Sequence, residues 1–257
     1  MSNLKSILSS FHLKDELNPK IWELPNERAM SDPKGQVEVM VPKVRERLLD
    51  IAYEFIDFLG VDVIVSDVVM TGSLANFNWS KYSDVDLHII ADFEQFSEKE
   101  RPLYEELFKL KKTLFNDKHN IKIYGYDVEL YVQDESEAHF SSGEYSVLFD
   151  EWITEPKKEN SEIDTNLIKL KSENWMKMID EVIEDAQEQS LESGIKTINK
   201  LKDKLKKYRT AGLEDGGEMS NENLVFKVLR RNEYIKKLFD FQNEYQDKKL
   251  SLKEKSI

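Results

Sequence analysis

The sequence contains no cysteine. Disulfide frameworks, thiolate metal sites and a catalytic thiol are therefore excluded, and any metal ion must be held by oxygen or imidazole ligands. Long apolar runs are also missing, because polar residues interrupt the N-terminal stretch every few positions. No segment approaches the roughly 18 apolar residues that a membrane-spanning helix needs. We therefore expect a cytoplasmic protein that does not enter a membrane.

Basic residues are too few to balance the acidic ones, and the imbalance is confined to one part of the chain. The formal net charge is −13. Residues 161–257 hold 19 Lys and Arg against 19 Asp and Glu, whereas residues 1–160 hold 18 against 31. An acidic first part disfavours general binding to a nucleic-acid backbone. The acidic excess in the first part of the chain instead favours a site that binds cations.

The 257 residues are enough for a catalytic domain with an appendage. Prolines and a glycine break up residues 1–35, so we expect a short helix near 3–12 followed by irregular chain. The pattern then predicts a catalytic domain over 36–155. A C-terminal helical domain is predicted over 161–250.

Helical and strand periodicities alternate through the predicted catalytic domain. Pro42 begins a helical pattern that Gly60 ends. Residues 61–72 are rich in β-branched side chains and predict a strand, and residues 84–92 alternate as a second strand. The remaining predicted strands are a third over 121–134 and a short edge strand within 143–153.

Helices are predicted in the intervening and following segments. A helix over 97–116 carries four leucines on one face, Leu103, Leu107, Leu110 and Leu114. The C-terminal domain is expected to contain helices over about 161–189, 191–210 and 220–247, with a break at 211–219 before the last.

Polar residues occupy the ends and one face of the predicted strands. Gly72 and Ser73 directly follow the first strand. Asp84 and Asp86 begin the second strand after ten intervening residues, and Glu129 lies inside the third. Side chains alternate along a strand, so Asp84 and Asp86 project from one face while their apolar neighbours enter the core. Glu129 is flanked by apolar residues in the same way.

The chemistry of these residues points to phosphates and a divalent cation. Two carboxylates at this spacing repel each other unless a cation lies between them. Mg²⁺ prefers hard oxygen ligands and is typically bound by a few carboxylates together with substrate phosphates. Glycine lets backbone amides approach phosphates closely, and the hydroxyl of Ser73 can donate to a phosphate oxygen.

Residues 70–87, MTGSLANFNWSKYSDVDL, resemble the motif of the DNA polymerase β-like nucleotidyltransferase superfamily. That motif is a strand, Gly-Ser, a spacer of about ten residues, and Asp-hydrophobic-Asp-hydrophobic, with a later carboxylate on a strand, the position of Glu129. The resemblance covers roughly residues 41–134 and extends to nucleotidyltransferase-domain proteins of bacteriophages. It implies an α/β (α+β) nucleotidyltransferase core, with a small mixed sheet flanked by helices, followed by an all-helical C-terminal domain.

The resemblance also implies an activity and roles for single residues. The protein would move an NMP, with AMP as the default, from an NTP to an acceptor hydroxyl and release pyrophosphate. Asp84 and Asp86 would bind two Mg²⁺ (or Mn²⁺) ions, and Glu129 would complete the metal site that activates the acceptor. Gly72 and Ser73 would hold the triphosphate. Acceptors compatible with this chemistry are a tRNA or other RNA, a protein side chain, or a small molecule.

The spacer departs from the pattern of minimal bacterial members of the superfamily, because it lacks their glycine and arginine. The cation that contacts the triphosphate is therefore not fixed by the motif. Lys81 in the spacer is one candidate, and Lys204 on a predicted C-terminal helix is another. Further basic side chains on these helices are Lys200, Lys207, Lys227, Arg230 and Arg231.

Three side chains near the motif each have two interpretations. His88, on the face of Asp86, could touch substrate or be a partly buried structural histidine. Trp79 and Tyr82 could stack on a base or pack against the core.

Two other functions are compatible with parts of the pattern. One is a glycosyltransferase that uses Asp84-x-Asp86, although that fold requires several βα units before the motif and leaves Gly72 and Ser73 unexplained. The other is a catalytically silent nucleotide-binding module acting in regulation or in a toxin or defence system.

Overall fold

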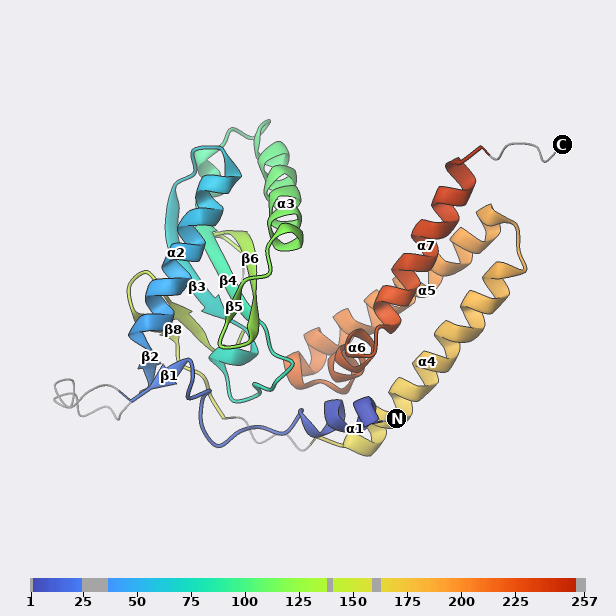
Figure 1. Ribbon diagram of the computed structural model, residues 1–257, viewed down its shortest axis with the longest axis horizontal. Coiled ribbons are helices and arrows are strands. Elements are labelled where there is room, and N and C mark those ends of the chain that lie inside the picture. The colour runs from blue at the N-terminus through green and yellow to red at the C-terminus, as the bar shows by residue number, and fades with distance from the viewer. Residues whose placement is uncertain (1, 25–36, 138–140, 159–162, 253–257) are drawn as a thin grey trace. The chain divides into compact units, whose positions relative to one another are not determined.

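The computed structural model describes residues 2–24, 37–137, 141–158 and 163–252 (Figure 1). The chain divides into two compact units. The sheet unit is His12–Glu159, and the helical unit combines Met1–Phe11 with Asn160–Ile257. Among the described residues, no helix is both long and apolar enough to cross a membrane.

This division differs from the predicted boundaries at the N-terminus. Helix α1 (Ser2–Ser9) packs with the helical unit, where Ile7 and Phe11 are buried. The next residues join the sheet unit, because Ile21 and Trp22 belong to its core. Residues 12–24 therefore belong to the sheet unit, and residues 25–36 lie outside the described residues.

A six-stranded mixed sheet forms the centre of the sheet unit, in the order β5-β6-β4-β3-β7-β8. Its strands are β3 (Val65–Thr71), β4 (Val85–Ala91), β5 (Lys122–Ile123), β6 (Tyr126–Asp134), β7 (Glu144–Ser146) and β8 (Glu151–Thr154). Strands β4 and β6 are parallel and the other pairs are antiparallel. A parallel pair needs a crossover connection. Helix α3 (Arg101–Lys118) is part of the connection between β4 and β6. A separate two-stranded sheet pairs β1 (Trp22–Glu23) with β2 (Val39–Met40).

Helices α2 (Pro42–Leu59) and α3 contribute to the core of the sheet unit. Pro42 starts α2, and Gly60 ends it with a left-handed φ of 69° while its N–H donates to the carbonyl of Asp57. The predicted helical face of α2 is confirmed by its buried residues, Val44, Leu48, Ile51, Ala52, Phe55 and Leu59. Figure 1 shows α2 running across the face of the sheet.

The leucine face predicted for α3 is exposed. Leu103, Leu110 and Leu114 are 71%, 61% and 45% exposed. The buried side of this helix consists of Phe108 and Phe115, which are 3% and 4% exposed. These rings pack against other aromatic side chains, and such contacts bury more apolar area than leucines can.

Two predicted strands are each divided by a turn. The segment predicted as one strand over 121–134 is a hairpin, because Tyr124 and Gly125 adopt positive φ angles of 49° and 95° between β5 and β6. The predicted edge strand within 143–153 is likewise the pair β7 and β8, with Asp150 at a φ of 63°. In each case the residues after the turn form a strand that pairs antiparallel with the strand before the turn.

The helical unit contains α1, α4 (Thr165–Gln187), α5 (Leu191–Gly216), α6 (Asn221–Arg231) and α7 (Tyr234–Leu250). Asp164 caps α4 by accepting hydrogen bonds from the backbone N–H groups of Asn166 and Leu167. Helix α5 continues through the predicted break as far as Gly216. The last predicted helix is divided instead, because Glu233 has a left-handed φ of 64° between α6 and α7.

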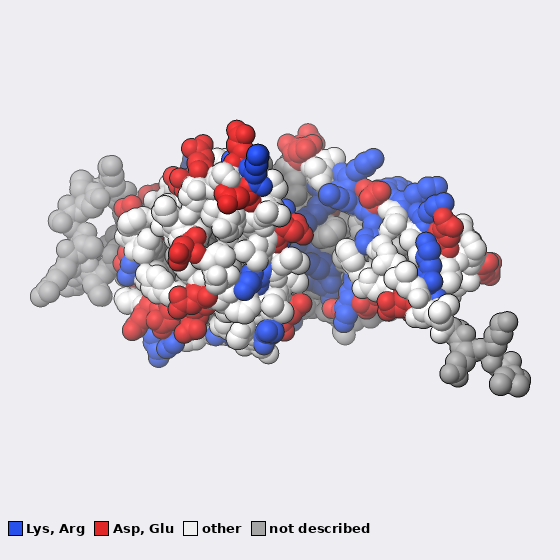
Figure 2. All heavy atoms as spheres, turned by 90° about the horizontal axis from the view of Figure 1, so that it is seen from above, with Lys and Arg blue, Asp and Glu red and all other residues white. Residues whose placement is uncertain are grey.

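The prediction of an α/β fold with a helical C-terminal part is thus confirmed at the level of a mixed sheet and seven α-helices in the described residues. Figure 2 shows acidic side chains prevailing on the visible face of the sheet unit, and Lys and Arg more frequent on that of the helical unit. This distribution agrees with the charge difference between the two parts of the sequence.

Candidate active site

Strands β4 and β6 bring two of the predicted carboxylates together. Asp86 lies directly opposite Glu129 in the parallel register of these strands. Neighbouring strands are about 4.8 Å apart, so these two side chains project from the same face within reach of one another. Asp84 immediately precedes β4, two residues before Asp86.

Burial alternates from Val85 to Ile89 as the sequence predicts, whereas the last residues of β4, Ile90 and Ala91, are both buried. Val85 and Leu87 are buried at 1% and 0% exposure. Asp84, Asp86 and His88 are half-buried on the other face, and Glu129 of β6 is exposed. The apolar residues of β4 enter the core of the sheet unit. The polar face thus presents its carboxylates to solvent.

Gly72 lies against the carboxylate of Asp86. It directly follows β3, whose last residue Thr71 pairs with Asp86. Its φ of 78° and ψ of −164° belong to a region that residues with a Cβ rarely adopt. A Cβ at this position would lie 2.0 Å from Oδ2 of Asp86. Glycine is therefore required for the backbone to approach the carboxylate this closely.

A hydrogen-bonded loop joins Gly72 to Asp84. The hydroxyl of Ser73 donates to Oγ of Ser83 at 2.7 Å, and the backbone N–H of Ser80 donates to the same oxygen at 2.9 Å. Asn76 donates from Nδ2 to the carbonyl of Gly72 at 2.8 Å. The bond between Ser73 and Ser83 links the residue after Gly72 to the residue before Asp84, so the two ends of the motif are held together.

Residues just before β7 fix Asn76 from outside the motif. The hydroxyl of Ser142 donates to Oδ1 of Asn76 at 2.7 Å. Gly143 packs so closely that a Cβ there would lie 2.1 Å from the carbonyl oxygen of Ala75. Sequence reasoning missed these residues, because Ser142 and Asn76 are 66 positions apart and the β3–β7 pairing brings them close.

Trp22 also anchors the loop after Gly72. Its indole N–H donates to the carbonyl oxygen of Leu74 at 2.7 Å, and its ring stacks on Trp152 with centroids 4.5 Å apart. Trp79 is held in a similar way, since its indole N–H donates to the carbonyl of Glu16 at 3.0 Å. Trp79 is half-buried and packs against the core, which supports the packing interpretation of this side chain.

No family model, curated protein or solved structure matches this chain. Function is therefore inferred from the residues and their geometry.

The donor set suits a hard divalent cation. Carboxylate oxygens are the ligands that Mg²⁺ and Mn²⁺ favour in proteins. Asp86 and Glu129 are neighbours in register, and Asp84 lies on the same face of the chain. Within the described ranges, no three Asp, Glu or His side chains are already grouped closely enough to hold a metal ion. Asp84, Asp86 and Glu129 stay the predicted ligands of such an ion.

The two lysines expected to contact a triphosphate lie in different units. Lys81, in the sheet unit, is exposed and its Nζ lies 4.9 Å from the ring centroid of Tyr82. Lys204 is part of α5 in the helical unit. Its Nζ lies 3.6 Å from Sδ of Met178 and 5.4 Å from the ring centroid of Trp175.

Lys227, Arg230 and Arg231 lie close to Arg209 within the helical unit. Burial and the charge of nearby Arg230 lower the pKa of Arg209, whose Nε donates to Oδ1 of Asn223 at 3.2 Å. Burial also lowers the pKa of Lys227; Glu218 opposes this effect, and Arg230 and neighbouring guanidinium groups add to it.

His88 contacts a buried partner on β6. Its Nδ1 lies 2.5 Å from Oε1 of Gln133, which is 4% exposed. Its ring centroid lies 5.2 Å from that of Tyr131. The bond to a buried amide supports the structural interpretation of this histidine.

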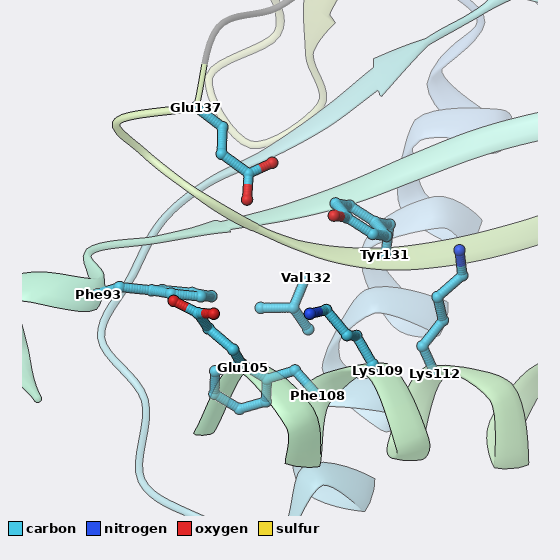
Figure 3. A pocket seen from close by; sticks show the side chains of 8 residues that line it. All are labelled: Phe93, Glu105, Phe108, Lys109, Lys112, Tyr131, Val132 and Glu137. Carbon is cyan, nitrogen blue, oxygen red and sulfur yellow. The ribbon is translucent and has the colours of Figure 1, made fainter. Parts of the chain in front are cut away.

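A small cavity of about 120 Å³ lies beyond Tyr131, between α3 and the end of β6. Figure 3 shows Lys109 and Lys112 rising from α3 on one side, with Tyr131 and Glu137 on the other. Burial, and then the charge of Glu137, raises the pKa of Tyr131. None of the three predicted metal ligands lines this cavity, so it is separate from the candidate active site.

Proposed function

We propose that this chain is a metal-dependent nucleotidyltransferase of the DNA polymerase β type. It would move an NMP, with AMP as the default, from an NTP to an acceptor hydroxyl. One observation carries the proposal: Asp86 lies beside Glu129 in register and against the backbone of Gly72. A turn suited to phosphates and a pair of carboxylates suited to a cation therefore share one corner of the sheet.

Asp84, Asp86 and Glu129 would hold Mg²⁺ or Mn²⁺ at this corner. When bound, such ions neutralise the charge of the phosphates and stabilise the attacking and leaving oxygens of an in-line displacement. An oxygen–phosphorus bond would form between the acceptor and the α-phosphate, pyrophosphate would leave, and the hydroxyl proton would be released. Because catalysis would consist mainly of positioning and charge neutralisation, no side chain would have to form a covalent bond to the substrate.

The turn at Gly72 would bind the triphosphate. The absence of a side chain at Gly72 lets the carboxylate of Asp86 lie against the backbone of the turn, where a bound cation would attract phosphate oxygens. The hydroxyl of Ser73 would exchange its bond to Ser83 for one to a phosphate oxygen, since a hydroxyl can rotate its single donor. Trp22 and Asn76 would keep the turn in place while this exchange occurs.

The topology disfavours the glycosyltransferase alternative. That reading requires several βα units before the Asp-x-Asp motif. Among the described residues, only β3 precedes Asp84 in the six-stranded sheet.

Pyrophosphate release tests the proposal. The full chain is incubated with each NTP, Mg²⁺ or Mn²⁺, and a pool of RNA, protein and small-molecule acceptors. We expect metal-dependent release from wild type and none from Asp84→Asn/Asp86→Asn. Asp127→Asn is the matched control, because this exposed carboxylate lies on β6 two residues before Glu129 and pairs with Lys122. Nucleotide binding without release under every condition would favour the catalytically silent module.

A further inference from the structure

The exposed face of α3 carries a regular row of leucines, here termed the leucine stripe. Its members are Leu103, Leu107, Leu110 and Leu114. They are separated by four, three and four residues, which is the heptad spacing of a helix that packs against another helix. Three of them are 71%, 61% and 45% exposed, and Leu107 is half-buried.

The sheet unit does not need the leucine stripe for its own core. Phe108 and Phe115 already attach α3 to the unit from a different face of the helix, roughly 120° around its axis from the stripe. Within the residues that the structure describes, Leu103, Leu110 and Leu114 of the stripe remain exposed. Contiguous exposed apolar side chains on a well-formed helix are typical of an interaction surface.

The charges beside the stripe favour a second copy of the same helix. Glu106 precedes Leu107 and Lys111 follows Leu110, so these charges flank the stripe on opposite sides. They are five residues apart, the separation at which flanking charges meet between two parallel helices in register. In an antiparallel pair, Glu106 would face Thr113 and no opposite charges would meet.

Both charged side chains can make this contact. In the described part of the chain, Glu106 is exposed and has no ion pair. Lys111 donates from Nζ to the carbonyl of Phe58 at 3.0 Å, which holds its ammonium group against the C-terminal turn of α2. An ammonium group has three N–H donors, so two remain for a carboxylate of the second copy.

We propose that two copies of this chain associate through α3. The helices pair in parallel and in register, each leucine of the stripe meets its counterpart, and Glu106 of each copy bridges to Lys111 of the other. A two-fold axis parallel to the two helices relates the copies, so the same surface of each copy forms the contact. The contact spans fewer than two heptads, so the dimer is weak and reversible. This association is independent of the proposed catalytic function.

Sedimentation velocity of the full chain tests the association, from low to several hundred micromolar. Wild type is expected to shift from monomer to dimer, and Leu110→Lys is expected to remain monomeric. Leu170→Lys is the matched control, because Leu170 is 57% exposed on α4 and lies outside the stripe. A wild type that stays monomeric throughout, or a Leu110→Lys variant that dimerises equally well, would overturn the proposal.

The absence of cysteine allows the orientation to be tested with single cysteines. In the parallel pair, Leu103→Cys lies opposite its own counterpart and forms a disulfide-linked dimer on oxidation. In an antiparallel pair, position 103 lies opposite position 114 of the other copy. The two copies of position 103 are then about 16 Å apart along the helix axis. Cross-linking only in a mixture of Leu103→Cys and Leu114→Cys would overturn the parallel register. Glu106→Lys should weaken the wild-type dimer several-fold, and an unchanged dimer would contradict the proposed ion pairs.

Discussion

Replacement of Gly72 by alanine is expected to destabilise the sheet unit and displace the carboxylate of Asp86. The backbone at Gly72 has a φ of 78° and a ψ of −164°. An added Cβ would lie 2.0 Å from Oδ2, 2.9 Å from Cγ and 3.3 Å from Cβ of Asp86. The substitution therefore imposes both backbone strain and an overlap that cannot be accommodated without movement.

The two effects have separate magnitudes. A residue with a Cβ in this backbone region costs about 1–3 kcal/mol. Moving the Asp86 side chain out of its present position costs about 1 kcal/mol more, the usual penalty for an unfavourable rotamer. We expect Gly72→Ala to lower the free energy of unfolding of the sheet unit by about 2–4 kcal/mol.

A double-mutant cycle with Asp86→Ala separates strain from overlap. Removal of the Asp86 carboxylate leaves the backbone strain and a 3.3 Å contact with the Cβ of residue 86, so the cost of Gly72→Ala should fall by about 1 kcal/mol in that background. Urea unfolding followed by tryptophan fluorescence measures these values, because Trp22, Trp79 and Trp152 all lie in the sheet unit. An equal cost in both backgrounds would refute the close approach of Gly72 to Asp86.

Trp22→Phe keeps an aromatic ring next to Trp152 but leaves the carbonyl of Leu74 without its donor, which should cost about 1–3 kcal/mol in the same unfolding assay. Unchanged stability would contradict this anchoring role. Lys171→Met should destabilise the helical unit by about 0.5–1 kcal/mol at pH 7, because it removes the ion pair with Glu222 at 2.9 Å. The hydrogen bond from Lys171 holds the pKa of Glu222 below its usual value of 4.5, so this stabilisation is present above that pH and is lost as pH falls through the lowered pKa. A difference between wild type and Lys171→Met that persists in strong acid, measured by thermal unfolding, would contradict this assignment.

Local periodicity predicted the elements that position the candidate site. The apolar row of α2 and the alternation of Val85 and Leu87 follow from helix and strand geometry, and both are confirmed by burial. These patterns depend only on neighbours in the sequence. The turn between β5 and β6 was not predicted, although Gly125 is a turn signal, because this single glycine lies within a run of strand-forming residues and Tyr124 beside it is typical of a strand.

Long-range pairing accounts for what the sequence could not predict. The register that places Asp86 beside Glu129 depends on the crossover through α3, and periodicity does not fix it. The support that Trp22 gives to the loop after Gly72 links residues 52 positions apart. The roles of Asp84, Asp86 and Glu129 in metal binding stay predictions.

Transfer of label from α-³²P-NTPs tests the central claim most directly. The full chain is incubated with each NTP, Mg²⁺ or Mn²⁺, and either a tRNA pool or a total lysate, and the products are separated by size. The proposed function predicts that wild type and Asp127→Asn move label onto an acceptor, whereas Asp86→Asn and Glu129→Gln, both shown to be folded, do not. Label transfer that survives Asp86→Asn, or no transfer by folded wild type with any NTP, would contradict it.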